Sequence, residues 1–357
     1  MSLAPSITAS LIGTTSRVYD GTTTASLTGA NFTFSSAIDG DSVSLSTPLS
    51  GTFDTKDVGA GKTVTATGLS VTGATNGGIT VHGYQLASTS VNAAIGEITP
   101  LTITAGLTGS VSKVYDSTNA ASLSAANYSL TGVLGLDAVA LNNPGAGTYD
   151  NANVGTGKAV SVTGLTLTGG DATNYVLTSS NASASIGSIT AKALTVTADN
   201  AVRFYGDPNP AFSASYAGFI PGEGPGVLGG ALSIVTAAAA TSGAGGYGVT
   251  PSGLTTSKSS LTFLPGTLTI NPRLLTITAE DKTKVYGDPE PAMTLMIGGA
   301  GLVNGDTLAG ALFAPTGSAA TAGTHAILQG TISAGPNYTL AFTPGTLHVT
   351  PAPLVIT

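Results

Sequence analysis

Two stretches of the chain carry nearly the same sequence: GTFDTKDVGAGKTVTATGLSVTG at residues 51–73 and GTYDNANVGTGKAVSVTGLTLTG at residues 147–169. Apolar residues alternate with Thr or Ser in TVTAT and AVSVT, which is the period of a strand with one buried and one wet face. Thr suits the wet face because β-branched side chains fit an extended backbone. The alternation slips at Gly68 and Gly164, where we expect a bulge or a tight turn.

Shorter motifs divide the chain into four consecutive modules of two kinds. Modules 1 and 2 contain RVYDG at residues 17–21 and KVYDS at residues 113–117, and modules 3 and 4 contain RFYGD at residues 203–207 and KVYGD at residues 284–288. Matching opening and closing strands place the modules at residues 4–99, 100–191, 192–272 and 273–352. Residues 353–357 repeat an opening strand, so we expect them to begin a further repeat of a longer protein.

The expected fold class is all-β, with each module a small Ig-like sandwich. The 49 glycines and 18 prolines punctuate short strands at the spacing of such folds. A β-grasp-like sheet is the alternative for modules 3 and 4, because NGDTLAGAL at residues 304–312 is compatible with a short helix capped by Asp306. The linkers are short and often contain proline, which predicts modules in an elongated, monomeric array.

Composition excludes several classes of protein. Only 8% of the residues are charged and the net charge is −7, whereas a nucleic-acid-binding protein needs clustered Lys and Arg. No stretch approaches the apolar length of a membrane-spanning helix. The chain has no cysteine, which excludes disulfides and thiolate metal sites. Its first residues, MSLAPSIT, lack the basic and apolar regions of a signal peptide, which fits an excerpt of a longer chain.

The tyrosine motif is the first candidate site, and its residues are Tyr19, Asp20, Tyr115, Asp116, Tyr205, Asp207, Tyr286 and Asp288. A Tyr–Asp pair can serve as acid and base. However, Asp next to Gly, Ser or Pro is typical of a turn in which the carboxylate bonds to backbone N–H groups. We expect a structural motif whose tyrosine covers the edge of the core and bonds to backbone, as in a tyrosine corner. The apolar residue before each tyrosine is expected to face the core, namely Val18, Val114, Phe204 and Val285.

A calcium site is the second candidate. Asp39, Asp41, Asp54 and Asp57 form the densest acidic group, and hard cations prefer oxygen ligands. The matching positions of module 2 are Gly135, Asp137, Asp150 and Asn153, which retain only half of the carboxylates. The three histidines, His82, His325 and His348, lie far apart and lack the spacing of zinc ligands. We therefore predict no cofactor, with calcium as the one candidate, and no catalytic residues.

Two known domain families resemble these modules. VYDGTT and VYDSTN resemble the YDG domains of bacterial surface proteins, although Ser117 replaces the glycine of the motif. FYGDPNP and VYGDPEP, followed by PGTLTI and PGTLHV, resemble MBG domains. The resemblance covers nearly the whole chain. It implies tandem arrays in very large exported proteins, often filamentous-haemagglutinin-like adhesins secreted by a dedicated outer-membrane partner.

The sequence and the resemblance together predict a stalk segment of a bacterial cell-surface or secreted adhesin, which has no enzymatic activity and acts in adhesion, aggregation or biofilm formation. Its expected partners are the neighbouring repeats of the same chain, and extracellular polysaccharide or a host or matrix surface. The alternative is a module that itself binds carbohydrate or matrix polysaccharide. With no Trp, 11 Tyr and 9 Phe, however, the chain has few residues for stacking on sugars. An enzyme is the third possibility, and no constellation of residues supports it.

Overall fold

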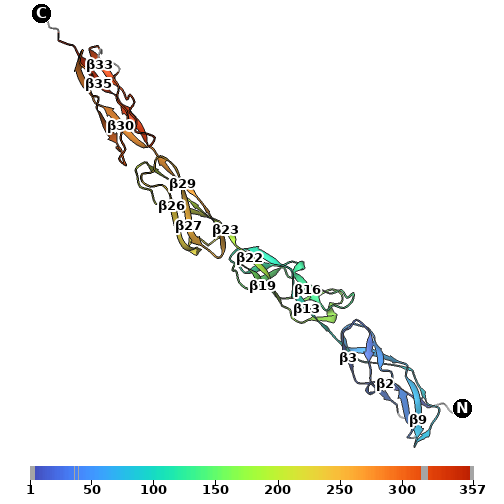
Figure 1. The fold of residues 1–357 in the computed structure, drawn as a ribbon. Helices are drawn as coiled ribbons and strands as arrows, with labels where there is room; N and C mark the ends of the chain where they lie inside the picture. Colours follow the sequence, from blue (N-terminus) through green and yellow to red (C-terminus); the bar gives the residue numbers. More distant parts are fainter. Residues whose placement is uncertain (1–4, 36, 39, 315–320, 354–357) are drawn as a thin grey trace. The chain divides into compact units, whose positions relative to one another are not determined.

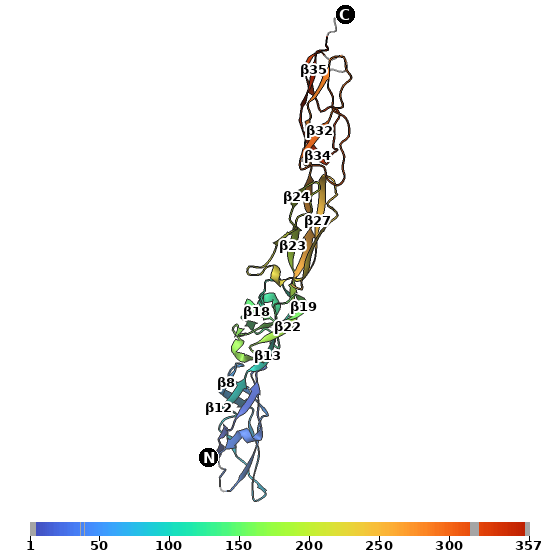
Figure 2. The ribbon, with the colours of Figure 1, turned by 90° about the vertical axis from the view of Figure 1, so that its left-hand side faces the viewer.

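The computed structural model describes residues 5–35, 37–38, 40–314 and 321–353. Nearly all of its regular structure is β-strand, as the alternating pattern predicted, and the described residues contain only short 3-10 helices besides (Figures 1 and 2). No helix of the described residues has the length and apolarity needed to cross a membrane. The chain divides into two units, Met1–Thr190 and Ala191–Thr357. Unit 1 contains modules 1 and 2, and unit 2 contains modules 3 and 4.

Module 1 is built from two larger sheets and two strand pairs. A five-stranded sheet has the order β3-β12-β8-β7-β4, a three-stranded sheet has the order β10-β9-β6, and β1 pairs with β11 and β2 with β5. The elements of module 1 are β1 (Ser6–Ile7), β2 (Ala9–Leu11), β3 (Thr15–Val18), β4 (Thr24–Ser26), η1 (Gly29–Asn31), β5 (Phe32–Phe34), β6 (Ser42–Ser46), β7 (Ser50–Phe53), β8 (Gly59–Thr67), β9 (Ser70–Asn76), β10 (Ile79–Thr80), β11 (Gln85–Leu86) and β12 (Ser90–Thr99).

Module 2 repeats this plan. Its sheets have the orders β14-β22-β19-β18-β15 and β16-β13-β21, with the pair β17-β20. Its elements are β13 (Leu101–Leu107), β14 (Val111–Val114), β15 (Ala120–Ser122), η2 (Ala125–Asn127), β16 (Tyr128–Thr131), β17 (Ala140–Leu141), β18 (Ala146–Tyr149), β19 (Gly155–Val162), β20 (Leu167–Thr168), η3 (Ala172–Asn174), β21 (Tyr175–Leu177) and β22 (Ala182–Thr190).

Modules 3 and 4 share a simpler plan of two sheets each. The orders are β25-β23-β28 and β24-β29-β27-β26 in module 3, and β32-β30-β34 and β31-β35-β33 in module 4. The elements are β23 (Lys192–Ala198), β24 (Ala201–Phe204), β25 (Ala214–Ala217), η4 (Pro225–Val227), β26 (Gly229–Thr236), β27 (Gly245–Thr255), β28 (Ser259–Leu264), β29 (Gly266–Asn271), β30 (Arg273–Ala279), β31 (Lys282–Val285), β32 (Leu295–Gly299), β33 (Gly323–Ile327), β34 (Tyr338–Thr343) and β35 (Gly345–Thr350).

The glycines at which the alternation slips are points where the chain changes sheet. Strand β8 ends at Thr67 and β9 begins at Ser70 in the other sheet, with Gly68 between them at φ +86°. Gly164 takes φ +74° at the same place in module 2. The strand therefore ends at both positions in a left-handed backbone conformation that glycine adopts without strain, although neither glycine lies in a tight turn.

The short helix expected at residues 304–312 is absent. This segment holds a turn at Asn304 and Gly305, with φ values of +55° and +80°, and an isolated bridge at Ala309. Gly310 also has a positive φ of +90°. Left-handed backbone at three positions is incompatible with a right-handed helix, so the prediction was wrong.

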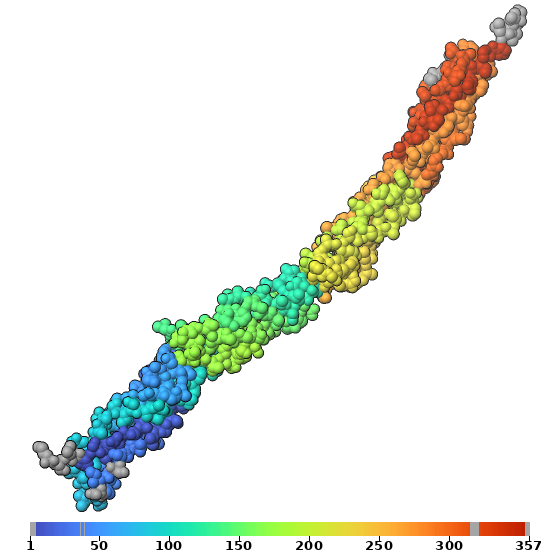
Figure 3. Space-filling view, turned by 180° about the vertical axis from the view of Figure 1, so that it is seen from behind, coloured from blue at the N-terminus to red at the C-terminus, as the bar shows by residue number. Residues whose placement is uncertain are grey.

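The buried residues of each unit form clusters that extend from one module into the next. In unit 1 one cluster includes Tyr19 and Ile98 of module 1 together with Ile103 and Tyr175 of module 2. In unit 2 a second cluster joins Tyr205 of module 3 to Tyr338 of module 4. The space-filling view shows the side chains of modules 1 and 2 meeting directly (Figure 3). Consecutive modules of one unit therefore share apolar packing as well as a linker.

Candidate functional site: the module junctions

The tyrosine motif lies where one module passes into the next. Strand β3 pairs in parallel with β12, the last strand of module 1, and the partner of Val18 is Thr99. The next residue, Tyr19, donates its backbone N–H to the carbonyl of Thr99 at 2.9 Å. Since β13 of module 2 begins at Leu101, this pairing holds Tyr19 against the linker.

Module 2 brings a second tyrosine to the same place. Strand β13 pairs in parallel with β21, so that Tyr175 lies opposite Leu101. The rings of Tyr19 and Tyr175 meet edge to face, with centroids 5.4 Å apart and an interplanar angle of 72°. Such aromatic pairs contribute about 0.5–1.5 kcal/mol beyond the burial of their surfaces. We call Tyr19, Lys56, Asp137, Asn174 and Tyr175 the unit 1 junction.

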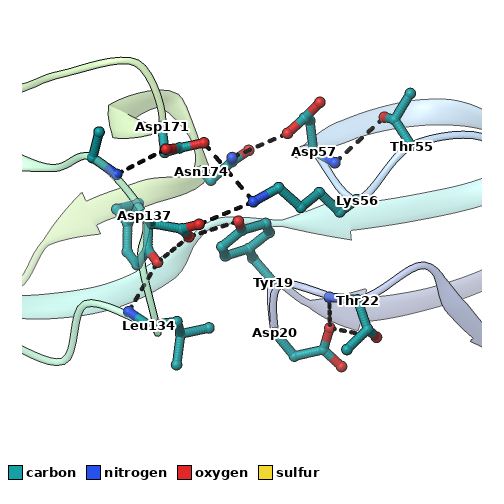
Figure 4. Close-up of polar contacts among 12 residues, drawn as sticks. Tyr19, Asp20, Thr22, Thr55, Lys56, Asp57, Leu134, Asp137, Asp171 and Asn174 are labelled. Atoms are coloured by element: carbon teal, nitrogen blue, oxygen red, sulfur yellow. Dashed lines mark hydrogen bonds and ion pairs between the residues drawn. The ribbon is translucent and has the colours of Figure 1, made fainter.

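Asp137 is the central acceptor of the unit 1 junction (Figure 4). The hydroxyls of Tyr19 and Tyr175 both donate to its Oδ2, at 2.7 and 2.6 Å. The ammonium of Lys56, from the loop between β7 and β8, donates to Oδ1 at 2.9 Å. Both Tyr19 and Lys56 belong to module 1, whereas Asp137 and Tyr175 belong to module 2. The carboxylate therefore accepts three charge-assisted hydrogen bonds, and two of them, from Tyr19 and Lys56, connect module 1 to module 2.

A tight turn and a side-chain amide complete the unit 1 junction. The turn places Asp137 by a bond from its N–H to the carbonyl of Leu134 at 3.0 Å, and the N–H of Leu134 donates to the Tyr175 hydroxyl at 3.1 Å. The Oδ1 of Asn174 accepts the N–H of Val58 in module 1 at 2.9 Å. Asn174 is buried, so this amide satisfies a backbone donor that would otherwise lose its water.

The bonds at the unit 1 junction shift the pKa values of its members apart. Hydrogen bonds from Tyr175, Tyr19 and Lys56 lower the pKa of Asp137 to about 2. Burial and the bond to Asp137 raise the pKa of Tyr175 to about 12. The same two causes raise the pKa of Tyr19. The hydrogen bond between Lys56 and Asp137 raises the pKa of Lys56. At neutral pH the carboxylate is therefore charged and both phenols keep their protons.

A similar arrangement occurs in unit 2, between modules of the other kind, except that only one of the two tyrosines donates to the aspartate. We call Tyr205, Arg273, Asp306, Asn337 and Tyr338 the unit 2 junction. Tyr205 and Tyr338 again meet edge to face, at 5.5 Å and 81°. The Tyr338 hydroxyl donates to Asp306 Oδ2 at 2.8 Å, and Asn337 Oδ1 accepts the N–H of Ala244 at 2.8 Å.

The turn that holds Asp306 also matches its counterpart. Asp306 N–H bonds to the carbonyl of Val303 at 3.0 Å, and the N–H of Val303 donates to the Tyr338 hydroxyl at 2.9 Å. Residues Leu134–Asp137 and Val303–Asp306 therefore form the same hydrogen-bonded turn. We call this turn the entry turn. It consists of an apolar residue, two further residues and an aspartate that accepts a tyrosine hydroxyl.

The two junctions differ in their basic residue and in the space around the motif. In unit 2 the guanidinium of Arg273 donates to the carbonyl of Tyr205 and to Asp207, at 3.1 and 2.9 Å. Gly206 has φ +85°, and a Cβ there would lie only 2.4 Å from Val303 Cγ2. The Y-G-D order thus leaves room for the entry turn of the next module, which accounts for the glycine between Tyr and Asp.

The predicted orientation of the tyrosine motif was wrong. Tyr19, Tyr115 and Tyr205 are buried, whereas Val18, Val114 and Phe204 are more than half exposed. The tyrosine shares the inward face with the basic residue two positions earlier, as buried Arg203 and Tyr205 show. Nor does the Tyr19 hydroxyl bond to backbone, since it bonds to Asp137.

The aspartates of the motif form turns in modules 1 and 2. Asp20 accepts the N–H of Thr22 at 2.8 Å, and Asp116 accepts that of Thr118 at 2.9 Å, as turn chemistry predicted. Asp20 also pairs with Arg17 at 2.8 Å, and Asp116 with Lys113 at 2.7 Å. The tyrosine and the aspartate of one motif therefore bond to different residues and do not form an acid–base pair. In module 4 the motif residues Tyr286 and Asp288 lie at the surface end of β31.

The three calcium candidates within the described residues, Asp41, Asp54 and Asp57, are not grouped as a metal site. Asp41 accepts hydrogen bonds from Tyr84 and Asn76, at 2.6 and 2.8 Å. Asp54 pairs with Lys62, and Asp57 bonds to the Asn174 amide. Asp39 lies outside the described residues. Within the described ranges, no three His, Cys, Asp or Glu side chains are grouped so that they could hold a metal ion, and this includes His82, His325 and His348.

Sequence reasoning missed four of the five residues of each junction: Lys56, Asp137, Asn174 and Tyr175 in unit 1, and Arg273, Asp306, Asn337 and Tyr338 in unit 2. A usable signal was present. Asn precedes Tyr at residues 174–175 and 337–338, and an apolar residue lies three positions before the aspartate at residues 134–137 and 303–306. These pairs recur across both kinds of module, which otherwise differ in sequence.

Comparisons with known proteins agree with the division into two kinds of module. The family profile of the YDG domain matches residues 4–91 and 99–186. That of the MBG domain (YGX type) matches residues 194–269 and 275–348. No curated protein matches the chain.

The solved structures that are similar include two from N-cadherin. The crystal structure of Drosophila N-cadherin EC1-4 has 10% sequence identity and a TM-score of 0.23, and covers 96% of this chain and 100% of its own. That of Drosophila N-cadherin EC1-3 has 9% identity and a TM-score of 0.20, and covers 69% of this chain and 98% of its own. A likeness of this size carries no argument about fold or function.

Proposed function

Because the chain consists of two YDG domains followed by two MBG domains, we propose that it is a non-catalytic stalk segment of a bacterial cell-surface or secreted adhesin. The segment carries an adhesive region away from the cell and serves in adhesion, aggregation or biofilm formation. The whole protein is exported, by a dedicated outer-membrane partner in a two-partner system. Each module is an Ig-like β-sandwich, and the four modules form an elongated, monomeric array.

The observation that carries this proposal is the pair of junctions. In each unit the buried tyrosine of one module packs edge to face on a tyrosine of the next module, and the hydroxyl of that second tyrosine donates to an aspartate of its own module. A chain that only linked independent binding domains would not need buried contacts at its linkers. Packing and charge-assisted bonds restrict bending between neighbours, and a stalk depends on that restriction.

The electrostatics of the unit 1 junction support a structural role over a catalytic one. A general acid or base works best with a pKa near the working pH. Here hydrogen bonds hold the pKa of Asp137 near 2, and burial holds that of Tyr175 near 12. Both shifts move the pKa values away from neutral pH, and the phenol–carboxylate bonds are among their causes.

Small-angle scattering of the whole chain, with and without EDTA, tests the proposal. We expect the maximum dimension of an elongated particle and no change on chelation. A compact particle would contradict the stalk, and a large change with EDTA would indicate structural calcium.

A glycan array provides the second measurement. Reproducible saccharide binding would replace the spacer role by that of a binding module.

A further inference from the structure

The tyrosine motif of module 4 differs from its counterparts in exposure. Tyr286 is 48% exposed, whereas Tyr205 is 3% and Tyr19 is 1% exposed. All three occupy the same position, directly after a strand that pairs in parallel with the last strand of the module. A half-exposed tyrosine at a position that is otherwise buried requires a physical reason.

Backbone conformation does not supply that reason. Tyr286 donates its N–H to the carbonyl of Thr350 at 2.8 Å, as Tyr205 does to Asn271 at 2.9 Å. The following turn is also the same, because the N–H of Asp288 bonds to Val285 and that of Asp207 to Phe204, each at 3.1 Å. The difference lies in what packs against the motif.

Module 4 covers the motif of module 3 with three side chains. Tyr338 packs edge to face on Tyr205, Val303 fits against Gly206, and Arg273 bonds to Asp207. At the end of module 4, no described residue bonds to the Tyr286 hydroxyl or to the Asp288 carboxylate. Gly287 repeats the conformation of Gly206, with φ +93°, and no atom lies within 4 Å of where its Cβ would be.

We propose that Tyr286, Gly287 and Asp288 form a docking surface for the entry turn of another module. The occupant is a β-module that presents an apolar residue three positions before an aspartate, together with an Asn-Tyr pair. The geometry favours this partner because both junctions use it, although their modules belong to different families. Chain direction agrees, since Pro351 follows β35 as Pro272 follows β29. The inference depends on the junction geometry and is independent of the stalk role.

The arginine contact will not be reproduced by every occupant. The alignment of GTLTINPR with GTLHVTPA places Ala352 where Arg273 stands. The stacked tyrosines and the apolar contact with glycine are therefore the features that define the docking surface.

The test is a longer chain in which a second copy of residues 272–350 follows Thr350. Tyrosine nitration with tetranitromethane, mapped by mass spectrometry, reports the exposure of Tyr286 in the original and the extended chain. We expect Tyr286 to be nitrated in the original chain and to be protected in the extended one, down to the level of buried Tyr205. Tyr205 serves as the internal reference in both chains. Equal nitration of Tyr286 in the two chains would overturn the proposal.

A matched variant separates docking from general shielding. Gly287→Ala strains the backbone at φ +93° equally in both chains, but its Cβ meets no neighbouring atom in the original chain and would collide with the entry turn only in the extended chain. We expect it to leave nitration of Tyr286 unchanged in the original chain and to restore nitration in the extended chain. Protection that persists in the extended Gly287→Ala chain would argue against docking. Hydrogen exchange in the added copy verifies its folding, and a copy that stays unfolded also counts against the proposal, because the same segment folds after Asn271.

Discussion

Asp137 illustrates how a single residue can depend on a neighbouring module. Its carboxylate accepts bonds from two phenols and one ammonium, and two of these three donors belong to module 1. The resulting low pKa of about 2, against an ordinary value of 3.8, makes the stability of the junction depend on pH. A depressed carboxyl pKa stabilises the folded chain above about pH 4 and loses that contribution as the pH falls toward 2.

We expect Asp137→Asn to lower the free energy of unfolding of unit 1 by roughly 2–3 kcal/mol at pH 7, because a hydrogen bond to a charged acceptor contributes about 1.5–3 kcal/mol. The difference between the two proteins should shrink as the pH falls from about 4 to about 2, where the wild-type carboxylate also becomes protonated. Calorimetry over a pH series measures both effects.

Asp41→Asn is the matched control for Asp137→Asn. Asp41 accepts the Tyr84 hydroxyl in the corresponding turn of module 1, and both of its side-chain donors, Tyr84 and Asn76, belong to its own module. We expect a smaller loss of stability. A penalty for Asp137→Asn that is the same at pH 7 and pH 2 would contradict the assigned role of the charge.

Ser117 is a second residue with a measurable effect. It stands where the motif of module 1 has Gly21, and the two residues take φ values of +66° and +76°. A non-glycine residue in this region costs roughly 1 kcal/mol. Ser117→Gly should therefore stabilise unit 1 by about that amount in calorimetry. Gly21→Ser should destabilise it similarly, since no atom lies near the position of the new Cβ. A destabilising Ser117→Gly would show that the serine hydroxyl makes a compensating bond.

Among the elements, the five-stranded sheet of module 2 contains a glycine that packing requires. Gly187 in β22 lies between β14 and β19, and a Cβ there would be 2.6 Å from the Tyr149 ring and 2.8 Å from the carbonyl of Lys158. Gly187→Ala should destabilise unit 1 by about 1–3 kcal/mol, as overpacking does. Gly155→Ala in β19 is the control, because nothing lies within 4 Å of its Cβ position. Urea unfolding compares the two, and equal midpoints would contradict the packing argument.

Strand periodicity accounts for what the sequence predicted at this scale. In LTIT of β30, Leu275 and Ile277 are buried and Thr276 and Thr278 are less so, as the alternation required. The tyrosine motif is too short for the same argument. In the motif a basic residue, an apolar residue and the tyrosine follow one another, so two assignments of the buried face are compatible with the pattern. If the buried face is assigned one residue off, every side chain is placed on the wrong face. Arg203 tolerates burial because it bonds to Asn209 and to the carbonyl of Ala239.

At the scale of the whole molecule, each junction should act within its own unit. Tyr19→Phe removes the hydroxyl that bonds to Asp137, and Tyr338→Phe removes the one that bonds to Asp306. We expect each to cost roughly 1–3 kcal/mol, and to raise hydrogen exchange only in residues 5–190 or 191–353 respectively. Tyr286→Phe is the control, because no described residue bonds to that hydroxyl. Increased exchange in both units from one substitution would contradict independent junctions.

The junctions themselves could not be predicted from the motif alone. Sequence analysis located Tyr19 correctly, but its partner Asp137 lies 118 residues away in another copy of the repeat. Repeats make the partner of Tyr19 difficult to predict, because Asp41 and Asp137 are equivalent by alignment. Only the contact across the linker distinguishes Asp137 as the partner. The distinction depends on which end of a module each side chain occupies, and strand periodicity does not encode that.

The division of each junction between two modules has a consequence for the gene. Module 2 carries an entry turn with its tyrosine and also a tyrosine motif of its own, so a single repeat encodes both parts from which such a junction is built. Unequal recombination that adds or removes a complete repeat of this kind preserves every contact pair without a compensating mutation. An event that breaks within a repeat leaves a buried tyrosine or a charged aspartate unmatched. Selection can therefore alter the number of repeats rapidly while the residues of the joints stay the same.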